Sequence, residues 1–127
     1  MAEPVWITRE VILATQEELL ERFGGLAGIR EDGFLDSALN RPKHLFAYSE
    51  PSLFAMAAAY AAGIVKNHPF IDGNKRAGFM AAYIFLGANG FDLDVPEEEV
   101  VLHTLALAAG DITETDYAAG LERSCGE

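Results

Sequence analysis

The strongest constraint on this sequence is a pair of long apolar segments separated by a short polar run. Residues 52–67 and 72–89 are apolar nearly all the way round at helical spacing, and turn signals bound both of them. Helices of this kind are central elements that are covered on every side. Small residues would let their two backbones approach closely. These are Ala57, Ala58, Ala61, Gly63, Ala77, Gly78, Ala81 and Ala82. The segments therefore predict two packed central helices in an all-α protein.

Capping signals predict two helices before this central pair. Thr8 can cap a first helix that runs to about Phe23, where a pair of glycines ends it. Asp32 can cap a short second helix that ends before Pro42, because the residue before a proline is disfavoured in the helical conformation.

Two further helices are predicted after the central pair. Asp94 and Pro96 open a helix that closes at Gly110, a residue type that favours a left-handed helix end. Thr113 and Asp116 have the spacing of a capping box and open the last helix. The chain should therefore hold about six helices.

Composition and length place these helices in one domain. The chain has 127 residues, no internal repeat and no linker, so we expect a single domain over residues 1–127. Half of its residues are hydrophobic and 23% are charged, a balance that excludes disordered and collagen-like classes. The single cysteine, Cys125, excludes an internal disulfide framework and a multi-cysteine zinc site. Residues 6–7 and 91–93 could add a minor β-hairpin.

Neither a membrane-spanning segment nor an export signal is expected. The longest uncharged stretches, 51–65 and 77–91, have 15 residues each, whereas a membrane span needs about 20. The N-terminal residues lack the basic region, apolar run and small-residue cleavage site of a secretory signal. We therefore expect a cytoplasmic protein.

The charge distribution argues against nucleic-acid binding and for a small anion. The formal net charge is −11, and such a surface would repel a phosphate backbone. Residues 51–91, however, carry Lys66, Lys75 and Arg76 against Asp72 alone, a local charge of +2, whereas the rest of the chain carries −13. This positive island is suited to a small anion rather than to a nucleic acid.

The polar run between the central helices, HPFIDGNKR, contains the elements of an anion site. The first amides of a helix have no intrahelical partners and attract anions. Gly73 lets a ligand approach the backbone closely, because it has no Cβ. Lys75 and Arg76 lie in the first turn, where the helix dipole disfavours cations, so an anion is needed to compensate them.

Two more residues of this run can do chemistry. Asp72 can cap the following helix, and its carboxylate could hold a Mg²⁺ ion that bridges phosphate oxygens. His68 can act as a base near neutral pH. Each residue alone would more often have a structural role, and it is their combination that indicates a site. The other histidines, His44 and His103, lack such neighbours and are interpreted as structural or surface residues.

The same nine residues resemble the signature of the Fic/Doc superfamily, H-x-F-x-[DE]-[GA]-N-[GK]-R. Lysine after the asparagine is the form of the death-on-curing (Doc) toxins, whereas AMP-transferring Fic enzymes usually have glycine there. The preceding GGLAGIREDGFLDSALNRPKHLFAY also looks Doc-like, and the resemblance covers residues 6–121. It implies the small all-α Fic fold, with the motif loop and the following helix at its centre.

The resemblance implies a role for each matching residue. His68 would activate the target hydroxyl, Asp72 would work with Mg²⁺, and Lys75 would act in catalysis. Nucleotide phosphates would be gripped by three side chains and by the loop amides around a glycine; these residues are Asn74, Lys75, Arg76 and Gly73. Phe70 would point into the core and anchor the loop.

The function implied is that of the toxin in a type II toxin-antitoxin system. Such a toxin transfers phosphate from ATP to a hydroxyl of a protein, with translation elongation factor Tu as the precedent, and so inhibits translation. Fic enzymes carry a second arginine where this chain has Phe79, and glycine where it has Lys75, and both differences favour phosphate over AMP transfer. The self-inhibitory pattern [ST]-x-x-x-E-[GN] does not occur, so a separate antitoxin chain is expected. The alternatives are a Fic-type AMP transferase and an inactive Fic-like binding module.

Overall fold

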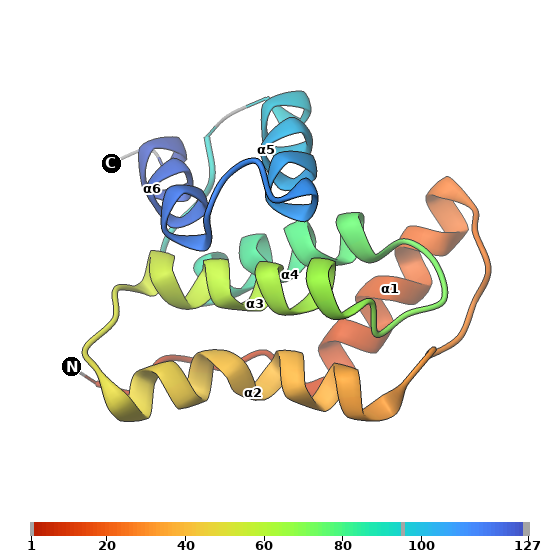
Figure 1. Ribbon diagram of the computed structural model, residues 1–127, viewed down its shortest axis with the longest axis horizontal. Helices are drawn as coiled ribbons and strands as arrows, with labels where there is room; N and C mark the ends of the chain where they lie inside the picture. The colour runs from red at the N-terminus through yellow and green to blue at the C-terminus, as the bar shows by residue number, and fades with distance from the viewer. Residues whose placement is uncertain (1, 95, 126–127) are drawn as a thin grey trace.

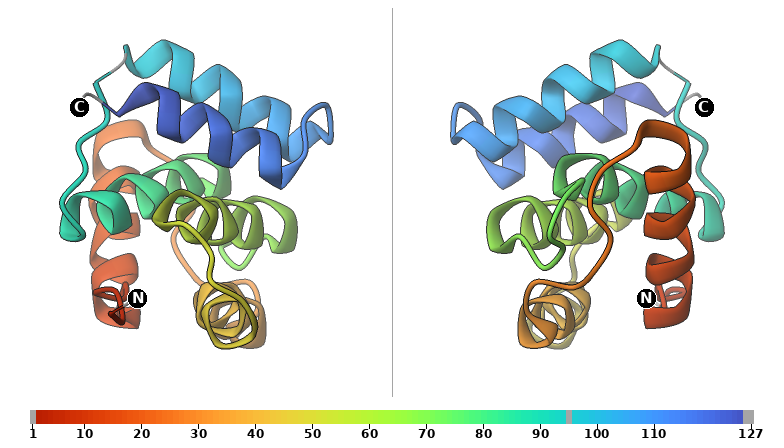
Figure 2. Two further views of the ribbon diagram at one scale, coloured as in Figure 1. Left: turned by 90° about the vertical axis from the view of Figure 1, so that its left-hand side faces the viewer. Right: turned by 90° about the vertical axis from the view of Figure 1, so that its right-hand side faces the viewer.

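Helices α3 and α4 form the centre of the computed structural model, which describes residues 2–94 and 96–125 (Figure 1). Helix α2 packs on one side of this pair, and α5 and α6 lie next to each other on the opposite side (Figure 2). Helix α1 packs against α4. The helices are α1 (Arg9–Phe23), α2 (Asp32–Tyr48), α3 (Leu53–Asn67), α4 (Asn74–Ala88), α5 (Glu97–Ala109) and α6 (Glu114–Ser124). The all-α prediction is confirmed.

Small residues bring the backbones of the central helices close together, as predicted. A Cβ atom added to Gly78 of α4 would lie 2.6 Å from Val65 Cγ1 and 3.2 Å from the Ala61 carbonyl oxygen on α3. A Cβ atom on Gly63 would lie 3.1 Å from the Ala38 Cα atom of α2. A Cβ atom would force a shift at Gly78 and an unusually tight contact at Gly63, so these glycines let α3 pack closely against both neighbours.

Most of the predicted helix ends are confirmed by their caps. The hydroxyls of Thr8 and Ser52 accept hydrogen bonds from amides in the first turns of α1 and α3. Thr113 and Asp116 form a reciprocal capping box at the start of α6. Helix α5 ends at Gly110 in the left-handed conformation, with φ of 82°.

The prediction for the second helix is wrong, because α2 continues through Pro42 to Tyr48. Proline costs one backbone hydrogen bond inside a helix. Here its ring is buried, and it continues an apolar stripe at helical spacing that packs on α3. The buried residues of the stripe are Leu35, Ala38, Leu39 and Pro42. Burial of this continuous face outweighs the local preference for a helix end.

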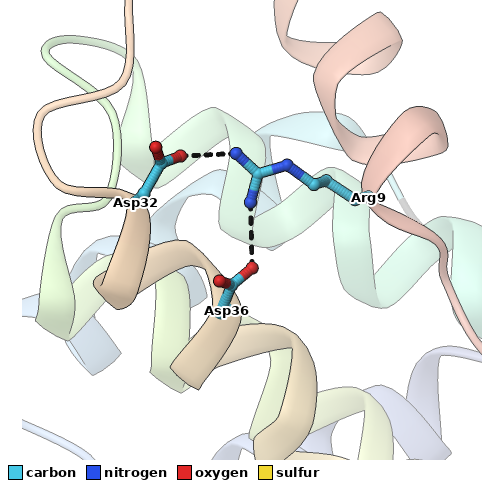
Figure 3. Close-up of polar contacts among 3 residues, drawn as sticks. All are labelled: Arg9, Asp32 and Asp36. Carbon is cyan, nitrogen blue, oxygen red and sulfur yellow. Dashed lines mark hydrogen bonds and ion pairs between the residues drawn. The ribbon is translucent and has the colours of Figure 1, made fainter.

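Asp32 also differs from its predicted role as a cap. It is the first residue of α2, and the N-cap is Glu31, which makes no side-chain capping bond. The Asp32 carboxylate instead pairs with the Arg9 guanidinium, which also donates to Asp36 over 2.9 Å (Figure 3). These contacts raise the pKa of Arg9, chiefly through the hydrogen bond to Asp32. They join the starts of α1 and α2 at the surface, where ion pairs contribute little to stability.

The minor hairpin predicted for residues 6–7 and 91–93 does not form in the part of the chain that the structure describes. The Ile7 amide donates to the Tyr60 hydroxyl over 3.1 Å, and Leu93 forms an isolated bridge with Cys125. The two segments are thus anchored separately, one on α3 and the other at the end of α6. None of the described helices combines the length and the apolar character needed to cross a bilayer.

Candidate active site

The polar run forms a tight loop where α3 turns into α4, at the end of the pair that lies beside α1 (Figure 1). His68 ends α3 in the left-handed conformation, with φ of 52° and ψ of 59°, and its side chain is exposed. Gly73 precedes α4, also left-handed, with φ of 77°. A side chain is disfavoured at that φ, so glycine lets the chain turn directly into the helix.

Phe70 and Asn74 close this loop from the inside. The Phe70 side chain is buried, which confirms that it anchors the loop in the core. Asn74 Oδ1 accepts a hydrogen bond from the Phe70 amide over 3.0 Å, and Nδ2 donates to the Phe70 carbonyl over 2.9 Å. Both ends of the buried Asn74 amide are therefore engaged in the loop itself. Its contact with phosphate stays a prediction, and its observed role is to hold the turn.

The prediction that Asp72 caps α4 is wrong. Gly73 is the N-cap residue, and α4 has no side-chain capping bond. Asp72 lies one residue too early: its exposed carboxylate accepts from the Gly73 amide over 3.0 Å and from the Leu26 amide over 3.3 Å. Among the residues that the structure describes, no side chain thus competes for the amides that open α4. The helix start is left available to an anion.

Gln16 of α1 supports the same turn and was missed in the sequence. It is buried, and its Nε2 donates to the Asp72 carbonyl over 2.7 Å. A Cβ atom on Gly73 would lie 3.3 Å from this nitrogen, so the amide packs directly on the turn. The signal available in the sequence was position: Gln16 falls four residues after the buried Ile12, on the apolar face of α1.

A segment between α1 and α2 runs alongside the loop. Ile29 and Phe70 form an antiparallel bridge, and the Ile71 amide donates to the Gly28 carbonyl over 3.1 Å. The Arg30 amide donates to the Pro69 carbonyl over 2.7 Å. The motif loop is thus held by backbone pairing with the segment between α1 and α2, as well as by Gln16 of α1.

Comparison with known proteins decides the family. The model of the Fic/DOC family matches residues 6–86, which include the whole loop and most of α4. The chain belongs to the Fic/DOC family. It is 32% identical over 122 residues to Protein kinase doc of Escherichia phage P1, covering 94% of this chain and 95% of that protein. It is 37% identical over 98 residues to Toxin Doc of Mycolicibacterium smegmatis, covering 71% of this chain and 74% of that protein.

In this Fic/DOC chain, Lys75 and Arg76 are exposed in the first turn of α4. The Arg76 guanidinium lies over the Phe23 ring, 4.3 Å from its centroid. Both cations border a cavity of about 250 Å³ between α1, α4 and α5. Its other lining residues are Leu19, Phe23, Phe79, Met80, Val101, Thr104 and Leu105. The two cations therefore belong to the uncapped first turn of α4 and also line an apolar cavity.

The other histidines of the Fic/DOC chain lie outside this site, as expected. His44 is exposed on α2. His103 of α5 stacks on the Tyr117 ring of α6, with 4.8 Å between centroids. Burial, aided by the charge of Arg123 and opposed by that of Asp116, lowers the pKa of His103. These features indicate that the His103 side chain has a structural role between α5 and α6.

The loop suits a magnesium ion better than a metal held by the protein alone. Among residues 2–94 and 96–125, no three histidine, cysteine, aspartate or glutamate side chains come together as a metal site. Mg²⁺ usually takes one or two carboxylates and completes its coordination with substrate phosphates and water. Each oxygen of the exposed Asp72 carboxylate accepts one amide hydrogen bond and keeps further lone-pair capacity. Asp72 can therefore hold an ion that arrives with a nucleotide.

Proposed function

We propose that this chain is a toxin that transfers the γ-phosphoryl group of ATP to a hydroxyl of a protein, acting in the cytoplasm. The observation that carries the proposal is the uncapped start of α4, with Lys75 and Arg76 in its first turn and His68 and Asp72 exposed in the adjoining loop. A helix start with free amides and two cations binds phosphates. A base and a carboxylate beside it supply the remaining groups of a phosphoryl transferase.

His68 would serve as the base. In the proposed transfer, the target oxygen bonds to the γ-phosphorus while the bond from that phosphorus to the β,γ-bridging oxygen breaks, and its electron pair stays on ADP. The hydroxyl proton passes to a ring nitrogen of His68. The amides around Gly73, with Lys75 and Arg76, orient the phosphates and offset their charge.

Asp72 is the residue that would hold Mg²⁺ in this mechanism. The ion, when bound, neutralises charge on the phosphate oxygens. The Asp72 carboxylate is fixed for this task by the Gly73 and Leu26 amides, while its carbonyl is held by Gln16. Both ends of the residue are therefore positioned before any nucleotide binds.

Transfer of AMP by the same residues is the alternative reaction. It requires a group that binds the outer phosphates as they leave, and Phe79 offers neither charge nor hydrogen-bond donor. The Phe79 ring packs edge-on against Tyr83, 6.0 Å between centroids, and borders the apolar cavity. Lys75 adds a cation able to neutralise a terminal phosphate. Both features favour attack at the γ-phosphorus.

The target and the partner are proposed from the family. A translation factor, with elongation factor Tu as the precedent, would carry the modified hydroxyl, and its modification would stop translation. A separate antitoxin would restrain the toxin in a type II system, and the name of the relative Toxin Doc supports the toxin part of this assignment. The cavity between α1, α4 and α5 suits an amphipathic helix that carries an acidic residue. Phe23, Val101 and Leu105 are partly exposed there, beside the two cations.

Labelled ATP tests the proposal. The purified chain, mixed with γ-labelled ATP and a cell extract, should label a protein, whereas His68→Ala should not. Expression should arrest growth, and co-expression with the neighbouring small reading frame should relieve the arrest. An intact chain that labels nothing and never affects growth would favour the inactive binding module instead. If the product of the small reading frame neither binds this chain nor relieves the growth arrest, the toxin-antitoxin assignment alone is rejected.

A further inference from the structure

Arg30 makes an unusual set of contacts with the motif loop. Its Nε donates to the His68 carbonyl over 2.8 Å, and its Nη2 donates to the Asn67 carbonyl over 2.8 Å. Its backbone amide donates to the Pro69 carbonyl over 2.7 Å. One residue thus satisfies three consecutive carbonyls at the point where α3 ends. Carbonyls at a helix end lack intrahelical partners, and a cation there is favoured by the helix dipole.

These contacts fall on a residue in an uncommon conformation. His68 is the one non-glycine residue with positive φ among residues 2–94 and 96–125. Left-handed backbone is disfavoured for a residue with a side chain and persists where surrounding contacts enforce it. The His68 amide donates to the Ile64 carbonyl over 3.1 Å, and its carbonyl accepts from Arg30. The peptide groups on both sides of the His68 Cα atom are therefore fixed.

The Arg30 side chain is itself held from the other side. Its guanidinium carbon lies 5.0 Å from the centroid of the Phe34 ring, in the first turn of α2. Arg30 thereby connects the start of α2 to the end of α3, through a planar group whose donors point at two adjacent carbonyls. A lysine has three donors on one nitrogen but lacks the rigid planar fork of arginine, so it would hold the two carbonyls less firmly.

We propose that Arg30 is a positioning residue that sets the direction of the His68 side chain through the backbone of residues 67–69. The inference rests on the proposed function for the importance of His68 in transfer. We expect Arg30 to make no contact with the nucleotide, because two of its guanidinium donors are committed to the Asn67 and His68 carbonyls and the group lies over the Phe34 ring. Its loss should therefore slow transfer without weakening nucleotide binding.

Three variants test this role: Arg30→Met, Arg30→Lys and Lys43→Met. The last is a control that removes an exposed cation on α2, away from the motif loop. Amide hydrogen exchange is measured for His68, Phe70 and Ile71 in the free protein. Arg30→Met should speed their exchange about tenfold or more, since two charge-assisted hydrogen bonds are lost. Amides in the middle of α3 should keep their wild-type rates. Arg30→Lys should give intermediate rates, and Lys43→Met should match the wild type.

Transfer kinetics provide a second, independent readout. We expect Arg30→Met to lower kcat about tenfold or more, with KM for ATP unchanged within about twofold, and Arg30→Lys to recover part of the loss. Unchanged loop exchange, exchange that rises equally throughout the chain, or a KM effect larger than the kcat effect would overturn the inference. A wild-type chain that transfers nothing would overturn the proposed function alone. In that case the exchange rates still decide whether Arg30 orders the His68 loop.

Discussion

The two ends of the α3–α4 pair differ in the balance of the forces that hold them together. At the end away from the motif loop, aromatic rings pack around Phe85 of α4. Trp6 stacks on Phe85 with 6.1 Å between centroids, and Tyr60 of α3 lies 5.2 Å from the same ring. Phe54 and Phe91 form an edge-on pair 5.0 Å apart. This end is stabilised mainly by burial of apolar surface. The Tyr60 hydroxyl and the Asn89 amide add hydrogen bonds to the backbone of residues 5 and 7.

The loop end is stabilised by hydrogen bonds to the backbone. Asn74 holds both polar groups of Phe70, Gln16 holds the Asp72 carbonyl, and Arg30 holds two carbonyls at the end of α3. The chemistry-bearing His68 and Asp72 side chains remain exposed. The comparison teaches that this fold separates stability from reactivity: the residues proposed to react contribute little burial, and the residues that support them do not react.

The largest expected effect is on activity at the loop end. His68→Ala should lower transfer by roughly 10²- to 10⁴-fold, because the proposed base is removed. Its melting temperature should stay near that of the wild type, since the side chain is exposed. His44→Ala, which removes an exposed histidine on α2, should leave both quantities unchanged. Loss of activity only in proportion to unfolding would break the separation between the two ends.

The reverse result is expected at the aromatic end. Phe85→Ala should lower the free energy of unfolding by about 3–5 kcal/mol, because the ring is fully buried among aromatic neighbours. Urea titration measures the loss. Transfer per folded molecule, assayed well below the unfolding transition, should be close to wild type. A folded Phe85→Ala protein with a disabled site would show that the two ends are coupled.

Two lysines at opposite helix ends sharpen the comparison. Lys75 lies in the first turn of α4, where the dipole opposes a cation, and Lys66 lies in the last turn of α3, where the dipole favours one. Lys75→Ala should leave the free protein equally stable or more stable by about 0.3–1 kcal/mol, while Lys66→Ala should cost a similar amount. Calorimetry should show weaker ATP binding for Lys75→Ala alone. A destabilised Lys75→Ala protein with unchanged ATP affinity would contradict the site.

The smallest effect concerns pH at the α5–α6 layer. Because burial lowers the pKa of His103, the folded state favours the neutral ring, and this contribution is complete above the unfolded pKa. It is lost as the pH falls below about 6.5 towards the depressed folded value. His103→Phe keeps a ring over Tyr117 without a titrating group, so its unfolding free energy should fall less between about pH 7.5 and 5.5. Equal losses in both proteins would show that His103 does not contribute.

The parts of the structure that could be predicted from the sequence are local. Thr8 and the Thr113–Asp116 box act within one helical turn, so their neighbours in the sequence are sufficient to identify them. Pro42 was misinterpreted because its burial against α3 depends on tertiary packing.

Prediction of the motif loop was limited in the same way, by contacts between residues distant in the sequence. Its residues could be picked out as a group, but the supports could not, because Gln16 is 56 positions from Asp72 and Arg30 is 38 positions from His68. Asp72 was misassigned as a cap because the left-handed turn at Gly73 places the helix start one residue later.

The mass of the modified target, measured together with the nucleotide product, tests the central claim most directly. Wild-type protein is incubated with ATP and its target, with His68→Ala as the control. If Lys75 and the start of α4 hold the nucleotide with its γ-phosphorus facing His68, the target gains the mass of a phosphate and ADP accumulates. An adduct with the mass of AMP, accompanied by pyrophosphate, would contradict the account and establish the AMP transferase in its place.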